Sequence, residues 1–192
     1  MRFATTLQNG RPELGVVDGA DWIALGLDLR SALEAGTDLV AAGRAAMDSG
    51  ARLPLAEQTF APLVPEPGKT ICLGLNYFDH AKEGGRTEKP DYPWFFYRGK
   101  SSLVGHGQPG LLPKVSFKFD YEAEMAVVIG KTVPRHTKRE DALQYIAGYS
   151  CFNDMSVRDF QKRTPPVWMK AGDVIEIEIE KIGVLRNPIA AE

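Results

Sequence analysis

The fold is decided by the stretch Phe119-Asp120-Tyr121-Glu122-Ala123-Glu124-Met125-Ala126-Val127-Val128-Ile129-Gly130. Its second half is apolar and β-branched, which predicts a buried strand. Asp120, Glu122 and Glu124 stand at alternate positions, so their side chains share one face of an extended segment. Like charges on a face that leads into an apolar core are destabilising unless water or a cation compensates them. The spacing therefore indicates a cation site.

A second acidic position strengthens this interpretation. The run Gly148-Tyr149-Ser150-Cys151-Phe152-Asn153-Asp154 reads as an apolar strand that ends in an acid. With Glu122 and Glu124, Asp154 would complete an all-oxygen site for Mg²⁺, Mn²⁺ or Ca²⁺, with positions left for water or a chelating substrate. Zinc would require His or Cys at ligand spacing. The alternative is an edge strand with solvated acids, in which Asp154 caps a following helix.

Composition and charge exclude several function classes. The 192 residues are 44% hydrophobic and 25% charged, as in soluble globular proteins. A formal charge of -2 and a pI near 6.0 give no general attraction for nucleic acid or for an anionic membrane. Residues 1–10 lack the apolar core of a signal peptide, and no later run could span a bilayer. We expect a cytoplasmic protein with no nucleic-acid or membrane partner, whose Cys72 and Cys151 are buried free thiols.

The chain divides into a small N-terminal module, residues 1–65, and a second domain, residues 66–192. Turn signals at Asn9-Gly10 and Asp18-Gly19 predict short strands and a hairpin within residues 3–25. Residues 28–51 fit one or two short helices. The Pro-rich stretch 62–69 is the predicted linker between the two domains.

The second domain alternates strands with short helical segments. Strands are expected at 70–75, 94–98 and 173–180, a helical turn at 76–83 and a helix at 139–145. His80 and Glu83 are spaced i, i+3 and share one face of the expected turn. Taken alone, His80 is also compatible with an ordinary exposed helix histidine.

These segments, in this order, resemble the fumarylacetoacetate hydrolase family over most of residues 70–187. The matching pieces are Cys72-Leu73-Gly74-Leu75-Asn76-Tyr77 with Asp79-His80, the Phe-Phe-Tyr-Arg strand before Ser101-Ser102-Leu103-Val104-Gly105, the stretch 120–130, Gly148-Tyr149, Asn153-Asp154-Met155-Ser156-Val157-Arg158-Asp159 and Lys170-Ala171-Gly172-Asp173-Val174-Ile175-Glu176. The resemblance implies an α+β protein, a mixed-sheet roll or barrel of this family's C-terminal type with a small N-terminal β/α module.

The resemblance also implies roles for particular residues. Glu122, Glu124 and Asp154 match the family's metal carboxylates, usually occupied by Mg²⁺ or Mn²⁺ and sometimes by Ca²⁺. His80 and Glu83 match the family's lid dyad, in which the carboxylate orients the imidazole so that it takes a proton from water.

A substrate of matching chemistry is a 1,3-diketo or β-keto acid, whose neighbouring oxygens can chelate a cation. Arg98 or Lys100 could bind its carboxylate, although each is equally compatible with a surface cation. Tyr77 and Gln108 are expected in the pocket, and His106 is expected to be structural.

One departure from the family lies near residues 161–169. Family members carry a long stretch here that supplies a metal-proximal lysine, much of the substrate pocket and a Gly-Thr-Pro loop. This chain instead passes from Asp159 through the short segment 160–168 directly to Met169 and Lys170. Loss of core strands would expose apolar surface and unpaired edges, so we expect that residues are omitted from this sequence.

The resemblance therefore predicts metal-dependent hydrolysis of a C–C bond in an acylpyruvate or diketo acid such as fumarylpyruvate or fumarylacetoacetate, by a homodimer. The same metal and fold support two alternatives, an oxaloacetate decarboxylase and a hydroxymuconate-type isomerase or decarboxylase. A third alternative is a metal-binding scaffold without turnover, which is favoured if the deletion is real.

Overall fold

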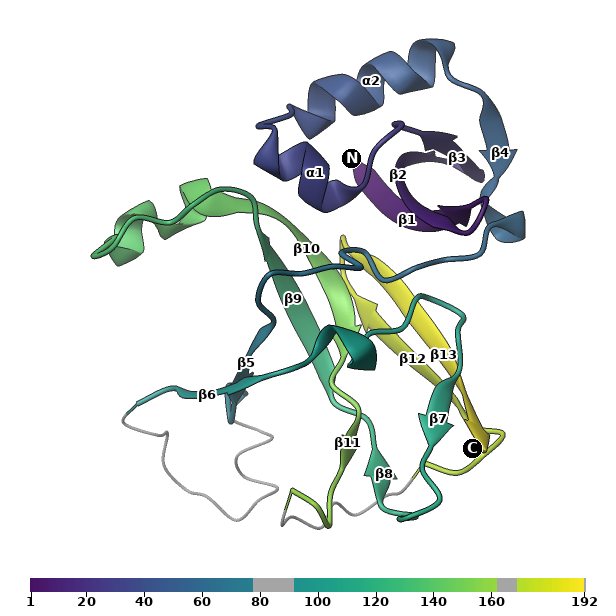
Figure 1. The fold of residues 1–192 in the computed structure, drawn as a ribbon, viewed down its shortest axis with the longest axis vertical. Helices are drawn as coiled ribbons and strands as arrows, with labels where there is room; N and C mark the ends of the chain where they lie inside the picture. Colours follow the sequence, from purple (N-terminus) through teal and green to yellow (C-terminus); the bar gives the residue numbers. More distant parts are fainter. Residues whose placement is uncertain (78–91, 162–168, 192) are drawn as a thin grey trace. The chain divides into compact units, whose positions relative to one another are not determined.

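The computed structural model describes residues 1–77, 92–161 and 169–191 (Figure 1). They form two compact units, one of Met1–Val64 with Val104–Glu192 and the other of Pro65–Leu103. Strands outnumber the two α-helices, which lie together in the N-terminal part. This arrangement confirms the predicted α+β class. No described helix is both long and apolar enough to cross a membrane.

The N-terminal part is an antiparallel sheet in the order β1-β2-β3-β4. Its strands are β1 (Arg2–Gln8), β2 (Arg11–Asp18), β3 (Asp21–Ala24) and β4 (Arg52–Pro54), followed by the short 3-10 helix η1 (Leu55–Glu57). Asn9 and Gly10 connect β1 to β2 with positive φ angles of 51° and 77°. Positive φ at both central residues gives a two-residue hairpin turn whose twist matches the strands. The predicted hairpin is confirmed.

The core of this sheet is apolar and dense. Leu14, Val16, Trp22 and Ile23 are completely buried. Gly15 lies against the indole of Trp22 so closely that a Cβ there would stand 2.2 Å from the ring. Glycine is therefore required by the approach of the Trp22 side chain from the neighbouring strand β3.

Two helices follow β3, as predicted for residues 28–51. They are α1 (Leu29–Glu34) and α2 (Leu39–Ser49), and α2 packs on β2 and β3 (Figure 1). Asp28 accepts a hydrogen bond from the Ser31 amide, and Asp38 accepts from the amides of Val40 and Ala41. Such side-chain caps satisfy the first N–H groups of a helix and fix where it begins.

The described residues from 104 to 161 and from 169 to 191 form three further sheets. Their elements are β7 (Gly110–Leu112), β8 (Phe119–Asp120), β9 (Ala123–Ile129), the 3-10 helix η3 (Arg139–Tyr145), β10 (Ile146–Asn153), β11 (Ser156–Val157), β12 (Val174–Ile179) and β13 (Gly183–Ala191). β9 pairs with β10 and β8 with β11, while β13 lies between β12 and β7. Because β13 runs parallel to β7 and antiparallel to β12, this last sheet is mixed. Among the described residues these sheets do not close into a barrel.

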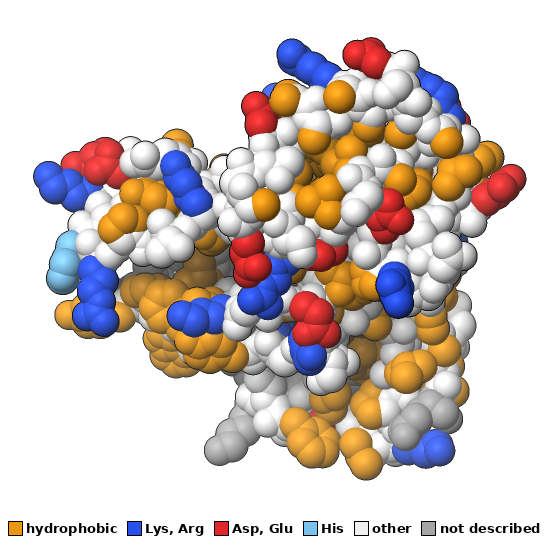
Figure 2. Space-filling view, turned by 45° about the horizontal axis from the view of Figure 1, so that its top comes forward, with side chains coloured by type: hydrophobic (Ala, Val, Ile, Leu, Met, Phe, Trp, Pro, Cys, Tyr) orange, Lys and Arg blue, Asp and Glu red, His pale blue; other side chains and the backbone are white. Residues whose placement is uncertain are grey.

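The expectation that the Val-Val-Ile run is buried is wrong. Val127 is 43% exposed and Ile129 is 53% exposed. Within the described ranges β9 is hydrogen-bonded to β10 alone, and a two-stranded ribbon cannot bury both of its faces. Large hydrophobic side chains accordingly reach the surface at several places on the face shown in Figure 2.

The unit Pro65–Leu103 contains β5 (Ile71–Gly74), β6 (Trp94–Tyr97) and the 3-10 helix η2 (Lys100–Ser102). β5 and β6 pair antiparallel, with Ile71 opposite Tyr97. The predicted strands are confirmed, but Ile71 and Leu73 are exposed rather than buried. Most of the expected helical turn at 76–83, and residues 162–168 of the expected gap, lie outside the described residues.

Candidate metal centre

The backbone brings two of the three predicted ligand residues together. Pairing of β9 with β10 sets Glu124 opposite Phe152 and Ala123 opposite Asn153. The contact continues one step further, because the Asp154 amide donates to the Glu122 carbonyl over 2.9 Å. Two acids 32 positions apart in the sequence are thus paired through their backbones, one residue beyond the ends of β9 and β10.

Burial argues against the alternative of solvated acids. Asp154 is 4% exposed and Asp120 is 5% exposed. Asp154 caps no helix, since the residues after it form β11, and the Ser156 hydroxyl donates to the Asp154 carbonyl over 3.1 Å. Buried carboxylates require compensation by hydrogen bonds or by positive charge.

Arg158 supplies part of that compensation, and the sequence interpretation missed it. This guanidinium is 4% exposed. Its Nε donates to Oδ2 of Asp120 over 2.8 Å, and its Nη1 donates to Oε1 of Gln161 over 2.6 Å. Nη1 also lies 2.9 Å from Oε1 of Glu122, so the two groups form an ion pair. The N–H bond does not point at this oxygen, and the contact is therefore not a hydrogen bond. The sequence feature that could have indicated a role for Arg158 is its position, because it is a basic residue four positions after the predicted ligand Asp154.

The three predicted ligands suit a hard divalent cation in their chemistry, because all are carboxylates. Two of them, Glu122 and Asp154, are also joined by a backbone hydrogen bond across the two segments. Their side chains, however, are not gathered. Among the described residues, no group of three or more His, Cys, Asp or Glu side chains is arranged to hold a metal ion. The carboxylate of Glu122 is turned toward Arg158 instead.

The other predicted site residues are spread over both units. Gln108 is half-buried in a loop before β7, and its carbonyl accepts from Asn187 Nδ2 over 2.8 Å. In the other unit, Lys100 pairs with Glu66 at 2.6 Å on the surface, and the Arg98 amide donates to the Thr70 carbonyl over 3.1 Å. Tyr77 is exposed. His80 and Glu83 lie outside the described residues.

His106 has the surroundings of a structural residue. Its Nδ1 accepts from the Arg186 amide over 3.1 Å, and its ring meets Phe60 edge-on at 5.0 Å. Burial first, and then the charge of Arg186, lower the pKa of His106. A neutral ring is needed for Nδ1 to accept a hydrogen bond.

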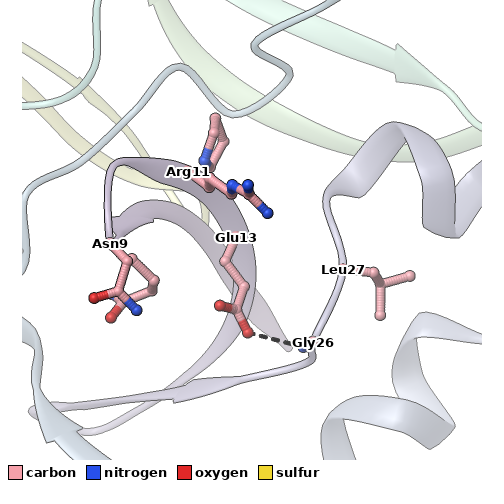
Figure 3. A pocket seen from close by; sticks show the side chains of 7 residues that line it. Asn9, Arg11, Glu13, Gly26 and Leu27 are labelled. Carbon is pink, nitrogen blue, oxygen red and sulfur yellow. Dashed lines mark hydrogen bonds between the residues drawn. The ribbon is translucent and has the colours of Figure 1, made fainter.

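An open pocket of about 490 Å³ lies against the N-terminal sheet (Figure 3). The Gly26 amide donates to the Glu13 carboxylate over 3.0 Å at its edge. Its lining comes from the segments 8–13 and 26–27 and includes none of the predicted site residues. The pocket therefore gives no support to the substrate positions predicted from the sequence.

Comparison with known proteins gives a family match and several relatives. The family model described as "Fumarylacetoacetate (FAA) hydrolase C-terminal" matches residues 69–165, about half of the chain. A Rattus norvegicus protein named "Oxaloacetate tautomerase Fahd2a, mitochondrial" is 40% identical over 140 residues, which cover 71% of this chain and 44% of the relative. The Homo sapiens protein of corresponding name, FAHD2A, is 42% identical over 111 residues, 58% of this chain and 35% of the relative. The chain thus spans less than half of the length of these relatives.

Solved structures agree on the fold. A fumarylacetoacetate hydrolase from psychrophilic Exiguobacterium antarcticum has a TM-score of 0.78 and 22% identity, and the match covers 100% of both chains. A maleylpyruvate hydrolase from Sphingobium sp. SYK-6, solved with manganese(II) and pyruvate, has a TM-score of 0.78 and 22% identity, covering 100% of this chain and 99% of that chain. At such identity the likeness concerns the fold alone.

Proposed function

Because the chain belongs to the fumarylacetoacetate hydrolase family, we propose that it carries the metal carboxylates of an enzyme that acts on enolisable 2-oxo acids. Glu122, Glu124 and Asp154 are the proposed ligands of one Mg²⁺ or Mn²⁺, with Ca²⁺ as a further possibility. The observation that carries the proposal is the hydrogen bond between the Asp154 amide and the Glu122 carbonyl, which joins two acids in a region where Asp154 is buried.

When bound, a divalent cation would supply a Lewis acid for the oxygens of a chelating keto acid. The protein's own groups would hold the ligands in place. Arg158, which directly follows β11, pairs with the carboxylates of Asp120 and Glu122. Metal loading would therefore require Glu122 to be shared with, or released from, the guanidinium.

Tautomerisation of oxaloacetate is the first candidate reaction, since the relatives about 40% identical to this chain are named as oxaloacetate tautomerases. In this reaction one proton leaves C3 of the keto acid and one is gained by the carbonyl oxygen, so no bond between heavy atoms is broken. Proton transfer of this kind needs a positioned base and stabilisation of the negative charge that develops on oxygen.

Hydrolysis of a C–C bond in an acylpyruvate is the second candidate. It is favoured by the sequence pair His80 and Glu83, in which an oriented imidazole could take a proton from water. Arg98, Lys100, Tyr77 and Gln108 are proposed substrate contacts in either reaction. Oxaloacetate decarboxylation, hydroxymuconate isomerisation and a scaffold without turnover remain as alternatives.

The subunit arrangement and the location also stay proposals. We propose a homodimer, on the grounds of the family resemblance alone. A cytoplasmic location is kept as a proposal, whereas the rat and human relatives are named as mitochondrial.

Parallel assays on purified protein distinguish the reactions. Oxaloacetate tautomerisation, oxaloacetate decarboxylation and acylpyruvate hydrolysis are measured on the wild type, Glu124→Gln and His80→Ala, with Glu178→Gln, an exposed strand acid, as the matched control. We expect Glu124→Gln to lose every activity that the wild type shows and Glu178→Gln to keep it.

His80→Ala separates the roles further. If water is activated by this imidazole, hydrolysis should fall by roughly 10²–10⁴, the usual contribution of a general base, while decarboxylation is largely kept. Equal losses in both reactions would mean that His80 positions the substrate. No activity of the wild type with any of the substrates would favour the scaffold.

A further inference from the structure

Asn153 is a buried polar residue next to Glu122 and Asp154, the two acids that the structure brings together. It ends β10, lies opposite Ala123 and immediately precedes Asp154. Its exposure is 7%. Neither the sequence pattern nor the proposed ligand set gives this side chain a role.

The side chain holds the backbone of Glu122. Oδ1 of Asn153 accepts from the Glu122 amide over 3.1 Å, while the Asp154 amide donates to the Glu122 carbonyl over 2.9 Å. Both backbone groups of Glu122 are thus bound by two consecutive residues of the facing segment. The identity of the accepting atom follows from its partner, since an amide N–H can donate only to the oxygen of the carboxamide.

This hydrogen bond stands where regular pairing stops. Tyr121 and Glu122 lie between β8 and β9 and belong to neither strand. The Asn153 carboxamide therefore takes the place of a ladder hydrogen bond at the residue that carries a proposed metal ligand. A side chain that fixes a ligand's backbone acts on metal affinity by keeping the carboxylate in position.

Stability alone does not explain an asparagine here. Nδ2 of Asn153 is buried and has no hydrogen-bond partner among the described residues, and a buried donor without an acceptor is destabilising. Asn187 provides the contrast, because it is equally buried but its Nδ2 donates to the carbonyls of Gly105 and Gln108 over 3.1 and 2.8 Å. The Nδ2 group of Asn187 therefore makes two hydrogen bonds within the fold, whereas Asn153 makes its hydrogen bond through Oδ1.

We propose that Asn153 is a positioning residue, which sets Glu122 against Asp154 so that both can bind one divalent cation. The inference rests on the proposed function of these carboxylates. It assigns the effect to the carboxamide oxygen and not to the volume or the buried N–H of the side chain.

The test compares three variants by calorimetric titration with Mn²⁺ on the whole chain. Asn153→Leu keeps the approximate volume and removes the acceptor, Asn153→Asp keeps an acceptor oxygen in the same place, and Asn187→Leu is the control for loss of a buried asparagine. We expect Asn153→Leu to weaken Mn²⁺ binding by about 10- to 100-fold, the usual effect of removing a residue that orients a metal ligand. Asn153→Asp should bind as the wild type does or more tightly, and Asn187→Leu should lower the unfolding temperature with unchanged affinity.

Hydrogen exchange of the Glu122 amide is followed in the same proteins. The amide should lose protection in Asn153→Leu and keep it in Asn153→Asp. If the leucine variant does not fold, Asn153→Ala carries the same expectation. Unchanged Mn²⁺ affinity in the leucine or alanine variant, or an equal loss in Asn153→Asp, would overturn the inference. Absence of Mn²⁺ binding in the wild type would instead overturn the proposed function and this inference with it.

Discussion

The N-terminal sheet and the carboxylate region bury opposite kinds of side chain. In the sheet, Leu14 and Trp22 are completely buried. Two helices with side-chain caps, α1 and α2, follow β3 in the same part of the chain. In the carboxylate region, which consists of residues 120–124 and 153–158, the buried side chains include Asp120, Asp154 and Arg158. The apolar residues of neighbouring β9, such as Val127, are left exposed.

The two regions therefore depend on different interactions for their stability, and the second region contains the proposed metal ligands. Burial of apolar surface contributes about 25 cal/mol per Å², whereas buried charges are stabilising only when they are well paired. The carboxylate region must therefore depend on specific pairs. Removing a side chain should have different consequences in the two regions, which the following changes test.

The largest effect is expected in the apolar sheet. Trp22→Ala would leave a cavity where the indole packs against Gly15 and remove the hydrogen bond from Nε1 to the Ala4 carbonyl, which is 3.1 Å long. We expect a loss of about 3–5 kcal/mol in the free energy of unfolding, measured by urea denaturation. Val40→Ala, at an exposed position of α2, is the control and should change it by less than about 1 kcal/mol. A loss in Trp22→Ala as small as in the control would contradict the account of this core.

A smaller effect that responds to metal is expected in the carboxylate region. Arg158→Met leaves Asp120 and Glu122 without their guanidinium, and breaking a buried pair costs about 3 kcal/mol or more. If Glu122 is a ligand of the proposed divalent cation, added Mn²⁺ should restore part of the loss, as measured by unfolding with and without the ion.

The control for this change is Arg186→Met. Arg186 pairs with Glu176 at 3.0 Å on the surface, and exposed pairs contribute at most about 1 kcal/mol. Its small loss should not respond to Mn²⁺. If Mn²⁺ stabilised the two variants equally, the ion would not replace the charge of Arg158 at Glu122, and the distinction between the two regions would be weakened.

The smallest effect on the free energy of unfolding is expected from the pH dependence contributed by His106, which lies in a loop. Burial, and to a lesser extent Arg186, lowers the folded-state pKa of His106 below the ordinary value of 6.5. The unfolded chain therefore takes up this proton first as the pH falls. The stabilising contribution is complete above about pH 6.5 and is lost as the pH falls through the folded-state pKa.

His106→Asn tests the pH effect, because its amide oxygen can accept from the Arg186 amide in place of Nδ1 but does not titrate. Urea unfolding of both proteins at about pH 7.5 and 5.5 should show a steeper loss in the wild type. Parallel pH dependence of the two proteins would rule out a contribution from His106.

Local patterns in the sequence predicted local structure well. The Asn9-Gly10 hairpin turn and the helices of residues 28–51 follow from backbone preferences and side-chain caps that act within a few positions. The strand 173–180 was likewise confirmed as β12. The position of Asp154 at the end of a strand was also predictable, because alternation and the terminal acid are both visible in the sequence.

Contacts between distant residues were not predictable in this way. The pair of Arg158 with Asp120 joins positions 38 apart, and nothing near Arg158 in the sequence identifies its partner. The exposure of Val127 depends on which other layers cover β9, which alternation cannot reveal. The division into domains at residue 65 stays a prediction, as do all the roles assigned to the site residues.

The central claim is that Glu122, Glu124 and Asp154 bind one divalent cation. Calorimetric titration with Mn²⁺ of the wild type, Glu124→Gln and the exposed control Glu178→Gln tests it most directly. We predict one ion per chain in the wild type and the control, and an affinity at least about tenfold weaker in Glu124→Gln, which corresponds to about 1.4 kcal/mol. Equal affinity in all three proteins, or no binding by the wild type, would contradict the claim.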